Sequence, residues 1–265
     1  MTAEPVHETK IEDLPISVYG TNQELGAAAA LEATGIIRHA VEQNGHANII
    51  VATGNSQLSF LAALREDKSI PWPQVNIFHM DEYVGIDPQH PASFPQFLRR
   101  HLLDYIHPQA FYPVPGQAQD VEQACRDYEA LLRAHPADLC ALGIGENGHI
   151  AFNDPPFADF HDPVWAKVVK LAPASRRQQV GEGHFASLDE CPTHAITLTV
   201  PALLAARQIL AIVPEARKAE AVCRALRGPI SEDCPASILR RTPHAHLFLD
   251  AESAALVSAD WRRDP

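Results

Sequence analysis

The sequence predicts a three-layer α/β fold, in a single domain whose mostly parallel sheet is covered by helices on both faces. Short apolar runs rich in β-branched residues alternate with segments of helical periodicity along the whole chain, as in parallel strands joined by helices. No linker-like stretch and no internal repeat divides the 265 residues. We therefore expect one domain over residues 19–265, preceded by a polar N-terminal arm over residues 1–18, which contains two prolines.

The individual elements follow from local pattern. An alanine-rich segment with apolar residues at helical spacing predicts the first helix, over residues 22–43. The run NIIVA then predicts a strand buried on both faces. The predicted strands cover residues 47–52, 75–80, 138–144, 165–171, 195–200, 208–213 and 245–249. The other predicted helices cover residues 57–67, 94–105, 120–134 and 215–226.

Composition argues against several classes of partner. The 21 Lys and Arg residues against 33 Asp and Glu give a net charge of −12, which repels nucleic acid and anionic lipid but still permits a small anion to bind local cations. The five cysteines form no C-x-x-C pair, which indicates reduced thiols and no zinc site. The first residues are polar and acidic, unlike the basic and apolar regions of a signal peptide, and no apolar stretch approaches the length of a membrane span. We expect a cytoplasmic protein without nucleic-acid or membrane partners.

The turn after the strand at 47–52 has the composition of an anion-binding loop. Thr53, Gly54, Asn55 and Ser56 stand between a buried strand and a helix. Free backbone N–H groups and the positive end of the helix therefore lie at the carboxyl edge of the sheet. Hydroxyl groups add donors, and the glycine permits close backbone approach. The same residues also fit an ordinary strand-to-helix turn with a capping side chain.

Two carboxyl groups stand at the end of the next predicted strand. Asp81 and Glu82 follow an apolar run, at the edge where open α/β sheets place their ligands. A carboxyl group leaving an apolar strand beside another carboxyl has a raised pKa, which suits a general base working near neutral pH. The alternative is that both are solvated acids of a loop.

A glycine-rich turn with a dense polar cluster follows the predicted strand at 138–144. The segment GIGENGHIAFNDPP presents Asn147, His149 and Asp154 within eight residues. An imidazole exchanges protons near neutral pH, and a neighbouring amide or carboxylate fixes its tautomer. A lone loop histidine is more often structural, but the density of polar residues here favours a functional one.

Cations near other strand ends are candidate phosphate ligands on this acidic chain. They are Arg176, His184 and Lys218, and arginine and lysine are natural phosphate partners. Each of them also fits a solvated helix face with acidic neighbours such as Glu215.

Together these segments resemble the sugar-phosphate family that contains glucosamine-6-phosphate deaminase and 6-phosphogluconolactonase. The similarity extends from about residue 47 to residue 249, with the segments in the same order. MDEYVG followed by HPASF, and then GIGENGHIAFNDP, are similar to the two signatures of the deaminase branch. The segments typical of the lactonase branch, G-D-E-R and D-G-H-x-A-S-L-F-P, are not found in the sequence. The resemblance implies a modified Rossmann-like fold without a metal or organic cofactor.

The resemblance also implies a reaction and a set of roles. The reaction is the isomerisation and deamination of an amino sugar phosphate, giving fructose 6-phosphate and ammonia. Asp81 matches the general base that moves a proton between C2 and C1, and His149 matches the histidine that assists ring opening. The residues that match phosphate ligands are the turn at 53–56, Lys218, and either Arg176 or His184.

Departures from the family pattern concern residues around the two catalytic candidates. His79 stands where asparagine is usual, and a cation there would lower the pKa of Asp81 and weaken it as a base. Asp154 replaces a glutamate, so it is expected to reach His149 less easily. Asn147 stands where aspartate is frequent. Asn55 replaces a smaller residue, which narrows the phosphate turn.

The sequence therefore predicts a phosphosugar deaminase and isomerase whose partner is a small phosphosugar. Two alternatives stay open. The same fold can act on an epimeric amino sugar phosphate or a phosphosugar lactone, or it can serve as a sensor that binds a sugar phosphate without turnover. The sequence is also compatible with a homo-oligomer.

Overall fold

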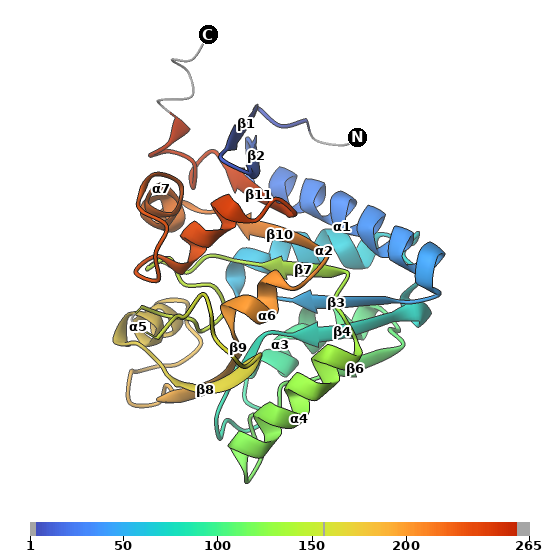
Figure 1. Cartoon of the computed structure of the whole chain (residues 1–265), viewed down its shortest axis with the longest axis vertical. Coiled ribbons are helices and arrows are strands. Elements are labelled where there is room, and N and C mark those ends of the chain that lie inside the picture. The colour runs from blue at the N-terminus through green and yellow to red at the C-terminus, as the bar shows by residue number, and fades with distance from the viewer. Residues whose placement is uncertain (1–3, 156, 259–265) are drawn as a thin grey trace.

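The structure is a computed structural model that describes residues 4–155 and 157–258. Its centre is an eight-stranded sheet with the order β1-β2-β11-β10-β7-β3-β4-β6 (Figure 1). Every neighbouring pair in this sheet is parallel except β1 and β2. The strands are β1 (His7–Ile11), β2 (Leu14–Tyr19), β3 (Ala47–Val51), β4 (Val75–His79), β6 (Ala110–Tyr112), β7 (Leu139–Leu142), β10 (Gln208–Val213) and β11 (Ala245–Asp250).

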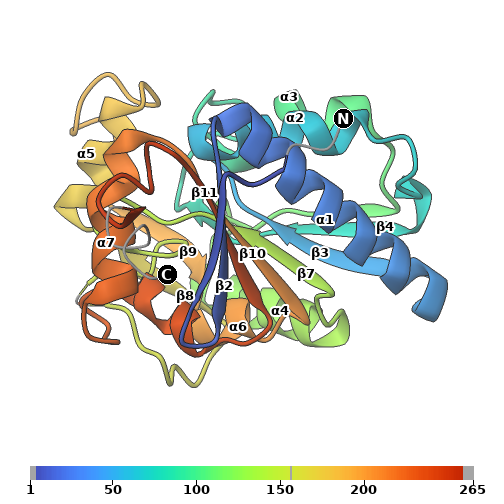
Figure 2. The ribbon, with the colours of Figure 1, turned by 90° about the horizontal axis from the view of Figure 1, so that it is seen from above.

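Helices cover both faces of this sheet, as the sequence predicts. The α-helices are α1 (Asn22–Asn44), α2 (Leu58–Glu66), α3 (Phe94–His101), α4 (Val121–Ala134), α5 (Pro173–Gly181), α6 (Val200–Leu204) and α7 (Ala219–Arg227). Short 3-10 helices are η1 (Asn55–Gln57), η2 (Trp72–Gln74), η3 (Leu103–Tyr105), η4 (Ala216–Lys218) and η5 (Pro235–Arg241). In Figure 2, α1, α2 and α3 lie on one side of the sheet, with α4 and α6 on the other.

Two hydrophobic cores follow from this layering. Successive side chains of a strand point to opposite faces, so Ile49 packs with α1 and α2 while Ile50 packs with α4, α6 and α7. Both side chains are at most 2% exposed. A strand buried on both faces needs a continuous apolar run, which explains NIIVA and confirms the predicted α/β class.

Three strands form a second, antiparallel sheet beside the main one. These are β5 (Asp81–Tyr83), β9 (His194–Leu198) and β8 (Ala166–Lys170). The sequence predicts the strands at 165–171 and 195–200 but not their separation from the parallel sheet. It also misses β5, which begins one residue after Met80, because so short a strand has no periodicity of its own.

The expectation of an arm over residues 1–18 is wrong for the part that the structure describes. Residues 14–19 form β2, which pairs with β11, and Leu14, Ile16 and Val18 are at most 3% exposed. Their period of two places all three on one face of the sheet. This alternation outweighs the polar residues and prolines that favoured an arm.

The remaining differences concern the ends of two helices and three elements that the sequence did not predict. The helix expected over 94–105 ends at His101 and is followed by η3. The helix expected over 215–226 begins with η4 and continues as α7. The sequence did not predict β6, α5 or α6, and α5 bears directly on the site.

The parallel arrangement brings four loops to one edge of the sheet. Strands β10, β7, β3 and β4 are consecutive in the sheet and all run in the same direction. Their carboxyl ends lead into residues 52–56, 80–82, 143–149 and 214–218. These loops contain most of the side chains that the sequence singles out.

We predict that Ile16→Ala lowers the free energy of unfolding by about 2–4 kcal/mol, because it leaves a cavity in the core. Lys10→Ala, on exposed surface of β1, should change it by less than about 0.5 kcal/mol. Equilibrium urea denaturation of the two variants and the parent measures both effects. If Ile16→Ala were as stable as the parent protein, residues 14–18 would be a loosely attached arm and not part of the core.

Candidate active site

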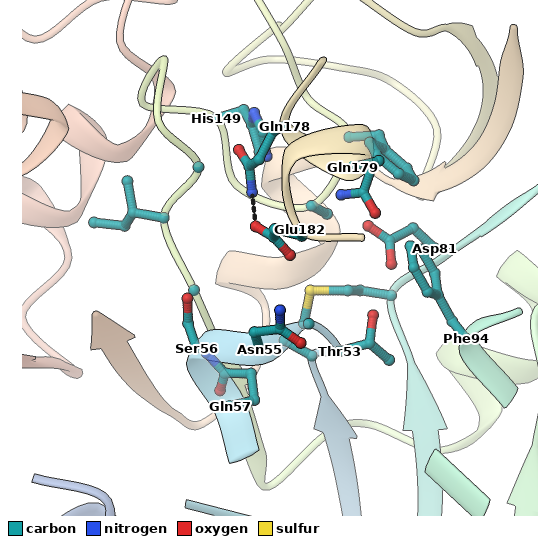
Figure 3. Close-up of a pocket in the computed structure, with 18 of the residues that line it drawn as sticks. Thr53, Asn55, Ser56, Gln57, Asp81, Phe94, His149, Gln178, Gln179 and Glu182 are labelled. Carbon is teal, nitrogen blue, oxygen red and sulfur yellow. Dashed lines mark hydrogen bonds between the residues drawn. The ribbon is translucent and has the colours of Figure 1, made fainter. Parts of the chain in front are cut away.

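A pocket opens where the four loops meet. Its wall includes the turn after β3, Asp81, His149 and Lys218. Figure 3 shows Asp81 and His149 on different sides of this pocket, with the turn containing Thr53, Asn55 and Ser56 below them. The structure thus collects residues from distant parts of the chain that the sequence places in one site.

The turn at 53–56 leaves backbone donors open. Gly54 has φ +99°, a backbone conformation that favours glycine. The backbone N–H groups of Gly54, Asn55 and Ser56 find no acceptor within residues 4–155 and 157–258. Gln57 stabilises the turn, since its Nε2 donates to the carbonyl oxygen of Ile212 on β10 at 3.1 Å. Adjacent open donors form an anion-binding concavity.

Lys218 adds a cation to the same wall. It ends η4, directly after β10, and is only 2% exposed. Burial, together with the neighbouring Arg217, lowers the pKa of Lys218 from 10.5 to about 8. The ammonium is therefore largely charged at neutral pH and loses its charge as the pH rises through 8.

Asp81 faces the pocket as a buried carboxyl group. It opens β5, pairs with Thr197 of β9, and is 7% exposed. Burial, with a smaller contribution from the nearby Glu82, raises the pKa of Asp81 well above its ordinary value. A carboxylate with a raised pKa is a stronger base, as proton abstraction from carbon requires.

Glu82 points away from the pocket and stabilises the start of α3. Its Oε2 accepts hydrogen bonds from the Ser93 hydroxyl at 2.9 Å and the Phe94 N–H at 3.2 Å. Burial nevertheless raises the pKa of Glu82 to about 7. Its influence on the pocket is thus electrostatic, through the pKa of Asp81.

His79 does not act as the expected cation. It is fully buried, and its Nε2 accepts a hydrogen bond from the Val114 N–H at 2.8 Å. Burial lowers the pKa of His79 to about 3, so the ring is neutral at neutral pH. The expectation that His79 weakens Asp81 as a base is therefore wrong.

His149 belongs to a compact hydrogen-bonded group. Its Nδ1 lies 2.7 Å from Asn147 Oδ1 and 3.0 Å from Asp154 Oδ1. Asp154 also accepts hydrogen bonds from Asn147 Nδ2 at 2.8 Å and Ser175 Oγ at 2.5 Å. Ser175 Oγ lies 3.2 Å from the same nitrogen but gives its own hydrogen to Asp154. Because all three neighbours of Nδ1 therefore act as acceptors, the neutral ring carries its proton on Nδ1 and keeps the lone pair on Nε2.

Asp154 reaches His149 directly, although its side chain was expected to reach the imidazole less easily than a glutamate. Although burial raises its pKa, hydrogen bonds from His149, Ser175 and Asn147 hold the pKa of Asp154 below its ordinary value. The residue is 1% exposed. Space for the ring comes from Gly145, where a Cβ would lie 2.1–2.4 Å from the imidazole.

Arg176 and His184, the two candidates for a further phosphate ligand, do not line the pocket. Arg176 donates to the carbonyl oxygens of Leu188 and Cys191, which fixes the loop after α5. His184 lies with its Nε2 3.3 Å from Glu182 Oε2. The structure thus separates Arg176 from the site and leaves His184 beside a carboxylate of the wall.

Helix α5 supplies residues that the sequence analysis missed. Ser175 contacts Asp154, while Gln178, Gln179 and Glu182 line the pocket. Figure 3 shows Gln179 beside Asp81 and Glu182 above the turn. In the sequence, Glu182 lies between Arg176 and His184, and this position is the only signal that could have pointed to it.

The described residues contain no group of three His, Cys, Asp or Glu side chains placed to hold a metal ion. Within the same residues, no helix combines the length and the apolar character needed to cross a bilayer. The five cysteines are free thiols.

Fold and site together define an α/β protein with a turn of open backbone donors, a buried general-base candidate and an imidazole–carboxylate group at one sheet edge. The chain belongs to the family of glucosamine-6-phosphate isomerases and 6-phosphogluconolactonase, whose sequence model matches residues 20–248. This match confirms the resemblance inferred from the two motifs.

Individual relatives agree with this assignment. The chain is 37% identical over 223 residues to glucosamine-6-phosphate deaminase of Bacillus cytotoxicus, covering 84% of this chain and 83% of that protein. A Bacillus cereus enzyme of the same name is 35% identical over 92% of the chain and 89% of its own length. A solved monomeric glucosamine-6-phosphate deaminase superposes with a TM-score of 0.84 at 30% identity, over 91% of this chain and 99% of that one. A 6-phosphogluconolactonase from Shewanella baltica, at 19% identity and TM-score 0.73 over 92% and 100%, shares the fold.

We predict that affinity for a phosphomonoester falls about tenfold between pH 7 and pH 9, because Lys218 deprotonates around pH 8. The ligand stays a dianion across this range, since its second pKa is about 6. Isothermal titration with glucitol 6-phosphate, which carries no amino group, measures the effect. Lys218→Arg should flatten the profile because its guanidinium keeps its charge. If affinity fell equally with pH in the parent and in Lys218→Arg, Lys218 would not bind the phosphate group.

Proposed function

We propose that this protein converts glucosamine 6-phosphate and water to fructose 6-phosphate and ammonia. The observation that carries the proposal is the placement of Asp81, a buried carboxyl group facing a pocket that is also lined by a turn with open backbone donors and by Lys218. A phosphate held at the turn presents the other end of a six-carbon sugar to Asp81. We take the substrate from the relatives, which are glucosamine-6-phosphate deaminases.

The first step assigned to this site is ring opening. His149, with its proton held on Nδ1 by Asn147 and Asp154, uses the lone pair of Nε2 to take the proton of the C1 hydroxyl group. Transfer of a proton to the ring oxygen breaks the C1–O5 bond and gives the open-chain aldehyde. Asp154 stabilises the imidazolium that forms in between.

Asp81 then carries out the isomerisation. Its carboxylate removes the C2 proton while the C1 carbonyl oxygen gains a proton, which gives an enolamine. Return of the proton to C1 and loss of a proton from the nitrogen give an imine at C2 and a hydroxyl group at C1. Addition of water to the imine carbon and loss of ammonia give the ketone of fructose 6-phosphate. Binding energy from the remote phosphate holds C1 and C2 against the carboxylate.

The proposal is tested with the purified full-length protein and glucosamine 6-phosphate, following ammonia and fructose 6-phosphate together. Equal amounts of both products are expected. With substrate deuterated at C2, the deuterium should move partly to C1 and partly to solvent. Hydrolysis of 6-phosphogluconolactone without ammonia release from the amino sugar would instead assign the lactonase reaction, and binding without any product would indicate a sensor.

We predict that Asp81→Asn lowers kcat by at least about a thousandfold while changing KM by only a few-fold, because the amide cannot accept the C2 proton. Asp87→Asn removes the same charge from an exposed position of the adjoining loop and should keep kcat within about twofold. Steady-state kinetics of the two variants decide the point. Substantial turnover by Asp81→Asn would refute its role as the base.

A further inference from the structure

Glu182 is a buried carboxylate in the wall of the anion pocket. Its side chain is 6% exposed. Oε1 accepts hydrogen bonds from Gln178 Nε2 at 2.8 Å and from the Arg217 guanidinium, and Oε2 lies 3.3 Å from His184 Nε2. Although burial raises its pKa, His184 and Arg217 lower the pKa of Glu182 to about 2, so the group is ionised at neutral pH.

This carboxylate lies over the turn that is built to receive an anion. Its Oε2 is 4.0 Å from the point that a Cβ of Gly54 would occupy. Figure 3 shows the Glu182 carboxylate directed from α5 towards the turn that bears Thr53 and Asn55. The open N–H groups of the turn and the buried Lys218 belong to the same wall.

The carboxylate of Glu182 is paired with a guanidinium, as a phosphate bound in this place would be. Arg217 pairs with Glu182 and, at 2.5 Å, with Glu215, and also lies 3.3 Å from Glu146. A phosphate dianion at the turn would approach the Glu182 carboxylate within a few ångströms, and like charges at that distance in a buried site repel strongly. Both anions cannot occupy this place together.

We propose that Glu182 is an internal occupant of the phosphate subsite, which the substrate phosphate displaces while taking over the guanidinium of Arg217. This inference rests on the proposed function only in naming the sugar phosphate as the molecule that carries the phosphate group. Arg217 lines the adjoining pocket and not this one, so a phosphate at the turn reaches its guanidinium only by replacing Glu182. The exchange would supply a second cation for the phosphate, a role that Arg176 does not fill because it is held by backbone carbonyl groups. Arg217 and Glu182 thereby set the affinity for the phosphate group.

A purely structural role for Glu182 predicts the opposite behaviour. If the carboxylate only connects α5 to Arg217, its removal loosens this cover over the pocket and weakens ligand binding. If it occupies the subsite, its removal frees the turn and strengthens binding. The sign of the change in affinity therefore separates the two roles.

The deciding experiment is isothermal titration of the full-length protein with inorganic phosphate at pH 7.5. Glu182→Gln keeps the shape of the side chain and removes its charge, so the Kd for phosphate should fall about tenfold. Glu146→Gln is the matched control, because Glu146 contacts the same Arg217 nitrogen but is 45% exposed and screened by water. Its Kd should change less than about twofold.

Arg217 is tested in the Glu182→Gln background, where no internal anion competes. Adding Arg217→Ala should raise the Kd for phosphate at least about tenfold, since the phosphate would then lose its guanidinium partner. Should Glu182→Gln fold poorly by circular dichroism, Glu182→Ala provides the same loss of charge. An unchanged or higher Kd in the charge-removing variant overturns the proposal.

These outcomes are separable from those for the proposed function. Tighter phosphate binding by Glu182→Gln, with no turnover of glucosamine 6-phosphate by the parent protein, supports the exchange and refutes the substrate. Normal turnover by the parent with no gain in phosphate affinity for the variant supports the function and refutes the exchange.

Discussion

The candidate site depends on the parallel alignment of β3, β4, β7 and β10. Because these strands run in one direction, their carboxyl ends bring the anion-binding turn, Asp81, His149 and Lys218 to the same edge. The alignment in turn depends on apolar strands buried on both faces, such as β3, whose five residues are all buried. Chemistry at the edge is thus a consequence of hydrophobic packing on the two faces of the sheet.

Within the pocket, burial affects ionisable groups in two different ways. Asp154 and Glu182 receive several hydrogen bonds from donors, which outweigh desolvation and lower the pKa of each. Asp81 and Lys218 lack such compensation, so desolvation raises the pKa of the acid and lowers that of the base. Burial thus shifts the pKa of the proposed base and of the proposed phosphate cation, while hydrogen bonds keep Asp154 and Glu182 ionised.

The sequence predicted the parallel sheet, and strong strand patterns pointed to the turn at 53–56, Asp81 and the segment with His149. Lys218 was singled out by the family resemblance, and the structure brings it to the same pocket. It failed where the outcome depends on contacts across the fold. The neutrality of His79 requires knowledge of its complete burial and of the Val114 N–H. The contact between Asp154 and His149 depends on the absence of a side chain at Gly145. Helix α5 has little apolar character, and only the structure shows that it covers the pocket.

Helix α5 also connects the two halves of the site. Near its start, Ser175 donates to Asp154, and directly after its end Glu182 lies over the anion-binding turn. Displacement of Glu182 by a phosphate acts on one end of a helix whose other end positions the His149 group. Under the proposed displacement, phosphate binding and the His149 group would contact the same helix, so binding energy from the remote phosphate could be used at the reacting centre. Inorganic phosphate and a sugar phosphate would both displace Glu182 under this proposal. Only the sugar phosphate would also place C1 beside His149.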